Sequence, residues 1–392
     1  MTATILDLPS PMIIDDDESL QRARAQLERA ARLAIDTESN SMWAYQEQVC
    51  LIQLSTDDQD YILDPLAFKD RSQLDFLGNL CADPSVEIVL HAAEYDIICL
   101  KRDFGFRFNH LFDTMVAARL LGIERVGLAN LLEEHFGVTM DKRHQRADWG
   151  KRPLADELLA YAQMDTHYLL DLRDIINREM DQRVEPAEAA ELFEEVTQVD
   201  PPDLSFDPDV YWRIHGSRDA SRRTMTILRE LYIYREKQAQ KRNRPPHKVM
   251  SDQTLMALAE AAPEHMSDLP ELPGMTAGQI RRYGRSILRA VKRGSERKLA
   301  RPPKRRRRPD QEILDRYDAL HNWRKQKAEE RGITSELILS KAMMWDIAQL
   351  APTSLEEFEE IKQLGPWRRE AYAGEIITLL ASLPQSDPDR RT

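Results

Sequence analysis

Short apolar runs alternate with stretches of helical spacing through the first 200 positions of this 392-residue chain. Runs bounded by turn residues predict strands at 12–14, 33–40, 49–54, 60–63 and 86–90. Apolar positions three and four apart predict helices at 15–31, 74–80, 93–102, 115–121, 128–135, 156–177 and 186–196. Strands followed increasingly by helices predict an α/β domain with a mixed sheet and flanking helices.

The pattern changes after a Pro- and Asp-rich stretch, VDPPDLSFDPD, and is helical from Tyr211 onward. LYIYREKQA at 231–239 aligns with LHNWRKQKA at 320–328, an offset of 89 residues that also pairs Pro263 with Pro352 and Tyr283 with Tyr372. A constant offset over core-type positions predicts two copies of one small helical domain. RPPKRRRRP at 301–309 lies between them and is too charged and Pro-rich to pack, so it is predicted to be a linker.

Two carboxylates end the apolar run of the segment LAIDTESN. Asp36 and Glu38 are two residues apart on a predicted strand, so both side chains project from one face. Like charges side by side repel each other, and a divalent cation such as Mg²⁺ or Mn²⁺ between them would remove the repulsion. Two solvated acids at a strand end would give the same pattern, so this pair alone does not decide the chemistry.

Three further residues suit the same chemistry. Asp96 lies near the start of a predicted helix, where the helix dipole alone would also explain an acid. Tyr161 and Asp165 are four residues apart and therefore share one helix face, an arrangement that is also common on ordinary helices. Four acids and a phenol in one α/β domain suit a two-metal phosphodiesterase, in which two ions stabilise the attacking and leaving oxygens.

Four segments together carry a resemblance to a known family: LAIDTESN, LHAAEYDIICL, FDTMVAARLLG and ADWGKRPLADELLAYAQMDTHYLLDL. They resemble the three exonuclease motifs of the DEDD superfamily in its Tyr-containing branch, most closely ribonuclease D and its exosome-associated relatives. The last segment is the most specific. The resemblance covers residues 12–180, and both helical repeats resemble HRDC domains. It implies a ribonuclease H-like α/β exonuclease domain followed by two all-α HRDC bundles.

The resemblance also implies roles for individual residues. By position, the family's metal ligands fall on Asp36, Glu38, Asp96 and Asp165, and its general base falls on Tyr161. Ala92 stands where other members carry Asn, so a substrate contact there is lost or comes from elsewhere. Contacts to nucleic acid are expected from Thr37, His91, Tyr95, Arg152, Arg281 and Arg285. Arg152 would serve equally well as the partner of a nearby acid.

The distribution of charge along the chain indicates which kind of partner to expect. The net charge is −12, yet residues 281–308 hold 14 Lys and Arg against one acid, which leaves −25 for the remainder. Such asymmetry predicts a polyanion partner for one region, although a solvated basic linker is the alternative. The chain lacks a membrane span and a signal peptide, so a cytoplasmic protein is expected. Cys50, Cys81 and Cys99 predict buried free thiols.

The combined prediction is a 3′–5′ exoribonuclease with two divalent ions, Mg²⁺ or Mn²⁺, and no organic cofactor. It would release 5′-mononucleotides from RNA with a free 3′ end, such as tRNA precursors. The expected domains are an exonuclease domain at 1–200, HRDC copies at 205–298 and 310–385, and a basic linker at 299–309. A DNA 3′–5′ exonuclease and a catalytically dead RNA-binding scaffold are the alternatives.

Overall fold

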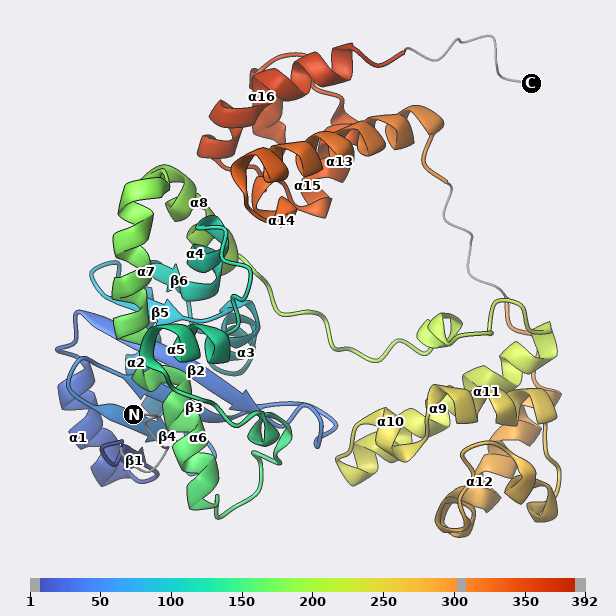
Figure 1. The fold of residues 1–392 in the computed structure, drawn as a ribbon. Helices are drawn as coiled ribbons and strands as arrows, with labels where there is room; N and C mark the ends of the chain where they lie inside the picture. The colour runs from blue at the N-terminus through green and yellow to red at the C-terminus, as the bar shows by residue number, and fades with distance from the viewer. Residues whose placement is uncertain (1–7, 302–307, 385–392) are drawn as a thin grey trace. The chain divides into compact units, whose positions relative to one another are not determined.

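The computed structural model describes residues 8–301 and 308–384 and divides the chain into two compact units (Figure 1). One unit contains residues up to Glu38, Val49–Pro201 and the chain from Arg308 onward. The other contains Ser39–Gln48 and Pro202–Arg307. Most of the predicted basic linker, residues 302–307, lies outside the described residues. Among the described helices, none is both long and apolar enough to cross a membrane.

A six-stranded mixed sheet, in the order β1-β4-β3-β2-β5-β6, forms the centre of the first unit. β1 pairs with β4, β2 with β5 and β5 with β6 in parallel, whereas β3 and β4 are antiparallel. The strands are β1 Met12–Ile14, β2 Arg32–Ser39, β3 Val49–Ser55, β4 Asp60–Leu63, β5 Glu87–Leu90 and β6 Leu111–Asp113. The predicted fold, a mixed-sheet α/β domain followed by helical bundles, is confirmed.

Eight α-helices accompany the sheet in the described part of this domain. They are α1 Asp17–Leu27, α2 Asp75–Ala82, α3 Glu94–Phe104, α4 Thr114–Leu120, α5 Leu128–Phe136, α6 Asp156–His167, α7 Leu169–Arg183 and α8 Pro186–Thr197. The single helix predicted at 156–177 is wrong in one respect. The chain leaves helical geometry at Tyr168, with φ −95° and ψ 1°, so α6 and α7 are separate helices and α7 continues to Arg183.

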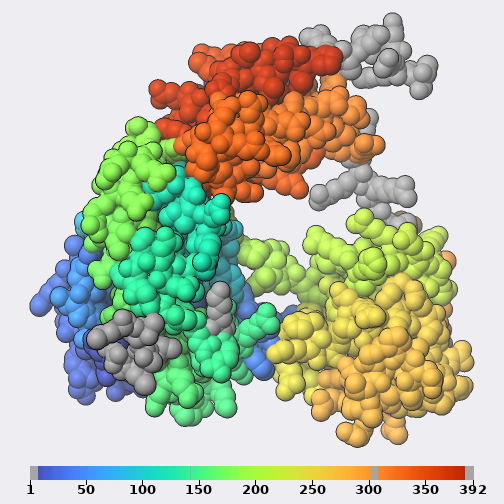
Figure 2. Space-filling view, in the orientation of Figure 1, coloured from blue at the N-terminus to red at the C-terminus, as the bar shows by residue number. Residues whose placement is uncertain are grey.

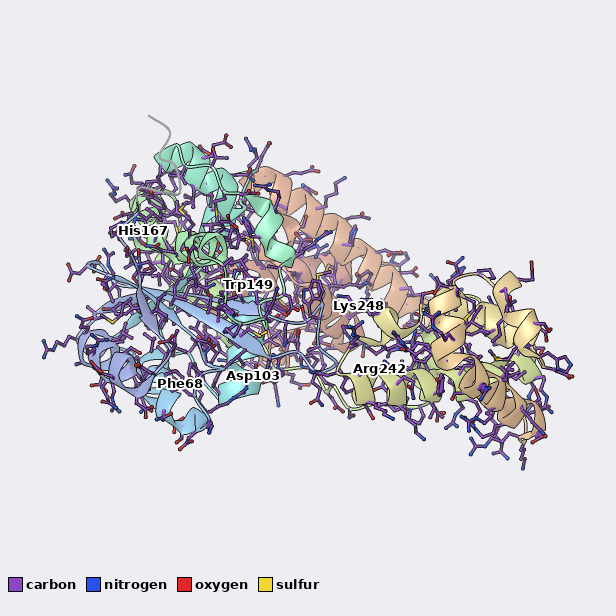
Figure 3. All side chains as sticks on the ribbon, turned by 90° about the horizontal axis from the view of Figure 1, so that it is seen from below. Phe68, Asp103, Trp149, His167, Arg242 and Lys248 are labelled. Carbon is purple, nitrogen blue, oxygen red and sulfur yellow. The ribbon has the colours of Figure 1, made fainter. Side chains whose placement is uncertain are left out.

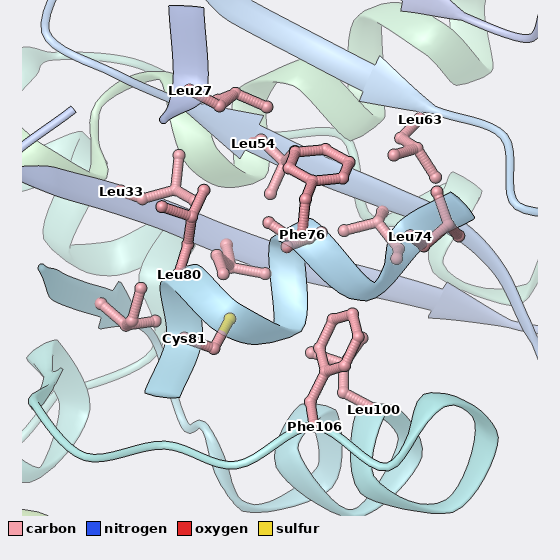
Figure 4. Close-up of a cluster of buried hydrophobic side chains, with 14 of the residues drawn as sticks. Leu27, Leu33, Leu54, Leu63, Leu74, Phe76, Leu80, Cys81, Leu100 and Phe106 are labelled. Atoms are coloured by element: carbon pink, nitrogen blue, oxygen red, sulfur yellow. The ribbon is translucent and has the colours of Figure 1, made fainter. Parts of the chain in front are cut away.

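Two hydrophobic cores lie on opposite faces of the sheet because side chains alternate along each strand. Leu33 and Ile35 of β2 belong to the core that α2 and α3 cover, where Phe76, Leu80, Leu100 and Phe106 pack together (Figure 4). Ala34 belongs to the core shared with α4, α5, α7 and α8. Since Asp36 and Glu38 continue the alternation of Ala34, both acids share its face of the sheet.

The C-terminal half repeats one arrangement of four helices. The first copy consists of α9 Arg222–Arg242, α10 Pro246–Val249, α11 Asp252–Ala261 and α12 Ala277–Glu296. The second consists of α13 Gln311–Arg331, α14 Ser335–Ile338, α15 Lys341–Leu350 and α16 Pro366–Ala381. Each helix of the second copy begins 89 residues after its counterpart, which confirms the predicted internal repeat.

Residues 39–48, which begin at the last residue of β2, belong to the second unit together with the first helical copy. The backbone N–H of Tyr45 donates to Oδ1 of Asn243 at 3.1 Å, and the Tyr45 hydroxyl donates to Glu236. The ammonium group of Lys248, labelled in Figure 3, lies 3.6 Å from the centre of the Trp43 ring. These contacts order the loop that directly follows the two acids of β2.

Candidate active site

The carboxyl end of β2 presents Asp36 and Glu38 to a pocket of about 390 Å³. β2 pairs with β5 in register from Arg32 to Ala34, which places the end of β2 beside the segment that leads from β5 into α3. Apolar residues hold the buried part of the strand, and the polar residues begin where the strand reaches the pocket. The period of the strand therefore delivers both acids to one side, as predicted.

Asp96 enters the same pocket from the first turn of α3, and β2 holds its carboxylate. The backbone N–H of Thr37 donates to Oδ1 of Asp96 at 3.1 Å, and the Thr37 hydroxyl donates to the same oxygen. Thr37 lies between Asp36 and Glu38 in sequence and points to the opposite side of the pleat. One strand thus supplies two acids and positions a third.

A second buried acid, Asp113, organises the turn before α3. Its carboxylate accepts hydrogen bonds from the N–H groups of Ala92 at 3.1 Å and Ala93 at 2.8 Å. It also caps α4 by accepting from the N–H of Met115 at 2.8 Å. Ala92 has a φ of +57°, in the left-handed region that Asn and Gly favour over other residues. The left-handed backbone of residue 92 therefore also suits the Asn that the resemblance implies for this position.

Tyr161 and Asp165 reach the pocket from one face of α6, one turn apart. A buried polar network fixes this helix against β3 and β4. Asp60 of β4 accepts from Gln163 Nε2 at 2.6 Å and pairs with His167 Nδ1 at 2.7 Å (Figure 3 labels His167). Because these two partners lie in the same helix as Tyr161 and Asp165, the Asp60 contacts set the rotation and height of α6.

The pocket therefore brings together all five residues predicted for catalysis: Asp36, Glu38, Asp96, Tyr161 and Asp165. Their catalytic roles remain a prediction. Gln145 and Asn130 also line the pocket, and sequence reasoning missed both. The Gln145 side chain lies beside Tyr161 and lowers the pKa of the phenol against the larger effect of burial. No periodicity marks either residue, since Gln145 lies in a short 3₁₀ turn, Lys142–Arg146, and Asn130 lies on the distant helix α5.

Burial and mutual repulsion raise the pKa of every acid in the pocket. Burial, followed by the charges of Asp165 and Asp96, raises the pKa of Glu38 to about 9. Burial and then Asp96 raise the pKa of Asp165 to about 8, and burial raises that of Asp96 to about 7 against the opposing effect of Thr37. The pKa of Asp36 is raised well above its usual value, first by burial and then by the other three acids.

A divalent cation among these acids would favour their ionised forms and so oppose the rise in their pKa values. Within the described part of the chain, no Lys or Arg lines the pocket, so the protein itself supplies no balancing charge there. Among the described residues, no group of three His, Cys, Asp or Glu side chains is already arranged to hold a metal ion. The residue types fit a divalent cation, and their carboxylates would have to converge on it.

The residues predicted to contact nucleic acid separate into three groups. Thr37, His91 and Tyr95 line the pocket. Burial lowers the pKa of His91 to about 4, and its Nδ1 lies 2.9 Å from the Thr114 hydroxyl. Arg152 is not among the residues that line the pocket. Its guanidinium pairs with Asp64, and Nη2 of Arg152 donates to Oδ1 of Asp64 at 2.7 Å. Arg281 and Arg285 are exposed on α12.

Comparisons with known proteins agree with this geometry. The sequence model of a 3′-5′ exonuclease family matches residues 11–181, and that of the HRDC domain matches 225–291 and 313–380. A ribonuclease D of Gluconacetobacter diazotrophicus is 29% identical over 378 residues, covering 95% of this chain and 93% of the relative.

Two crystal structures are similar to the whole chain or to most of it. Escherichia coli RNase D, described as an exoribonuclease involved in structured RNA processing, has a TM-score of 0.65 and 25% identity, covering 96% of this chain and 100% of its own. The catalytic core of RRP6 from Trypanosoma brucei has a TM-score of 0.66 and 27% identity, covering 75% of this chain and 81% of its own.

The fold, the acidic pocket and the matched domains define a 3′–5′ exonuclease that carries HRDC modules. The chain is similar to ribonuclease D proteins over nearly its whole length and is a 3′–5′ exoribonuclease, of a superfamily that generally uses divalent metal ions.

Proposed function

We propose that the pocket removes nucleotides one at a time from the 3′ end of RNA, with Asp36, Glu38, Asp96 and Asp165 holding two divalent cations, Mg²⁺ or Mn²⁺. The observation that carries this proposal is that four acids with raised pKa values line one pocket, Asp96 and Asp165 buried and Asp36 and Glu38 half-buried. The cations would neutralise the phosphate and lower the pKa of the attacking water. Hydrolysis would leave a 5′-mononucleotide and a shortened 3′ end.

Tyr161 would orient the attacking water. Burial, and then the charges of Asp165, Glu38 and Asp36, raise the pKa of the phenol, so its proton is retained at neutral pH. A protonated phenol donates one hydrogen bond and accepts another, and Gln145 lies beside it. Its position one turn before Asp165 puts the phenol beside the acids that would hold the cations.

Pocket residues outside the acid cluster would contact the terminal nucleotide. His91 is neutral at pH 7 because burial lowers its pKa to about 4, so its ring would hydrogen-bond to the nucleotide without adding charge. Tyr95 exposes 46% of its surface at the same pocket and offers an aromatic face to a base. We propose structured RNA such as tRNA precursors as the substrate, because the helical repeats provide additional surface for the body of the RNA.

Digestion of 5′-labelled RNA and of the matching DNA in the presence of Mg²⁺ or Mn²⁺ tests the proposal. The wild-type chain should shorten RNA stepwise from its 3′ end and act more slowly on DNA. Asp36→Ala should be inactive while binding RNA normally in EDTA, because it removes a proposed ligand and no repeat surface. The matched control Asp58→Ala, an exposed acid between β3 and β4, should retain activity. A wild-type chain that cuts neither strand with either metal would refute the proposal.

A further inference from the structure

The two helical repeats share one fold but differ in charge. Residues 222–296 of the first copy contain 15 Lys and Arg against 8 Asp and Glu, a net charge of +7. The equivalent 75 residues of the second copy, 311–385, contain 9 Lys and Arg against 13 Asp and Glu, a net charge of −4. Because the helices correspond at a constant offset, the difference can be assigned to individual positions.

The last helix of each copy contributes 5 of the 11 charges of difference, as many as the first helix does. Apart from Arg293, which pairs with Glu230, the exposed cations of α12 are Arg281, Arg282, Arg285, Arg289 and Lys292. They follow one face of the helix, opposite the buried Tyr283, Ile287 and Val291. The equivalent positions of α16 hold Glu370, Ala371, Gly374, Thr378 and Ala381. The second copy therefore has no cation at any position of this face.

The cations of α12 are available to a partner. Within the described chain, Arg281, Arg282, Arg285 and Arg289 form no ion pair, although Arg289 donates to the Ser286 hydroxyl at 2.9 Å. α12 lies at the surface of its unit, where it appears in yellow-orange in Figure 2. Unpaired arginines in a row with helical spacing match the repeating negative charge of a nucleic-acid backbone.

The second copy uses its own cations to bind the exonuclease domain. Arg331, at the end of α13, donates to both carboxylate oxygens of Glu188 in α8, at 2.8 and 2.6 Å. Glu188 exposes only 2% of its surface. Arg368 of α16, also 2% exposed, pairs with Glu195 of α8 at 2.8 Å. Arg368 is buried and the guanidinium of Arg331 is taken up by Glu188, so neither arginine is available to RNA.

The N-terminus of α16 is capped by a side chain from α8. Oε2 of Glu191 accepts from the N–H of Trp367 at 2.7 Å and from the N–H of Arg368 at 3.3 Å. The carboxylate fits because residue 365 is Gly: a Cβ there would lie 2.0 Å from Cδ of Glu191. At the equivalent position of the first copy, Thr276 caps its own helix through Gln279. The last helix of the second copy is therefore capped by a residue of the exonuclease domain, whereas that of the first copy is capped by its own residue.

We infer that the two repeats have different roles. The first binds the RNA backbone through the cationic face of α12, and the second packs against α8 of the exonuclease domain. This inference rests on the proposed function, since it takes RNA as the substrate of the pocket. It predicts that charge removal weakens RNA binding only when the first copy is changed.

Binding of a tRNA-sized RNA to the full chain in EDTA tests the division. Arg281→Gln, Arg285→Gln and Arg289→Gln together should weaken binding at least tenfold and reduce the slope of log Kd against log salt by about 2 to 3. The matched control removes three charges from exposed positions of the second copy, with Lys325→Gln, Lys341→Gln and Lys362→Gln. It should change Kd less than twofold. Equal losses in both triple variants, or no loss in the first, would overturn the inference.

Cleavage of a trinucleotide separates this inference from the proposed function. A trinucleotide is too short to occupy both the pocket and α12. The α12 variant should therefore digest it at the wild-type rate with Mg²⁺ or Mn²⁺. A wild-type chain that fails to digest it refutes the nuclease proposal, whereas a normal rate combined with unchanged RNA affinity in the α12 variant refutes only the division. Unchanged thermal unfolding of both triple variants will show that they fold.

Discussion

Replacing Glu38 with Gln should abolish RNA hydrolysis and yet stabilise the metal-free protein at pH 8. In the folded protein the pKa of Glu38 is about 9, raised mainly by burial, against an ordinary value of 4.5. Folding therefore takes up a proton at Glu38 whenever the pH lies between these values. The stability contributed by the protonated group is complete below pH 4.5 and is lost as the pH rises towards 9.

The expected loss of stability follows from the difference between the two pKa values of Glu38. One pKa unit corresponds to about 1.4 kcal/mol, so raising the pH from 5.5 to 8 costs the wild-type protein up to about 3 kcal/mol through Glu38 alone. Gln carries no titrating proton and avoids this loss. For a domain of this size, about 3 kcal/mol corresponds to a difference of about 6 to 12 °C in Tm.

Thermal unfolding in EDTA at pH 5.5, 6.5 and 8 measures the effect. The matched control is Glu133→Gln, because the Glu133 side chain on α5 is 61% exposed. The gap in Tm between Glu38→Gln and wild type should widen steadily with pH, whereas Glu133→Gln should follow wild type. Added Mn²⁺ should stabilise wild type more than Glu38→Gln. A gap that does not widen between pH 5.5 and 8 would refute the idea that burial keeps this acid protonated.

Three further predictions concern single positions. Tyr161→Phe should lower kcat for RNA digestion about 100-fold while leaving RNA affinity in EDTA unchanged; an unaltered kcat would remove the phenol from the reaction. Gly365→Ala should push the Glu191 carboxylate off the start of α16 and cost about 1 to 2 kcal/mol, measured by thermal unfolding and by faster amide exchange at the start of α16. Ala92→Asn should raise stability by about 0.5 to 1 kcal/mol, because its φ of +57° suits Asn; a lower Tm would contradict this account.

Local periodicity allowed several features to be predicted from the sequence. The alternation along β2 determines that Asp36 and Glu38 share a face, because strand side chains repeat every two residues wherever the strand lies. The helical period likewise places Tyr161 and Asp165 together on α6. The 89-residue offset predicted the second helical copy, since equivalent sequences form equivalent helices.

Only the tertiary structure decided which distant residues meet. Gln145 reaches Tyr161, and Thr37 holds Asp96, through packing between elements that no local period relates. Arg152 could have met phosphate or an acid, and the fold pairs it with Asp64. Glu191 caps a helix that begins 175 residues later in the chain, a contact that depends on where α8 and the second copy pack. Spacing along the chain determines which face of an element a residue occupies, but the packing of whole elements determines what that face meets.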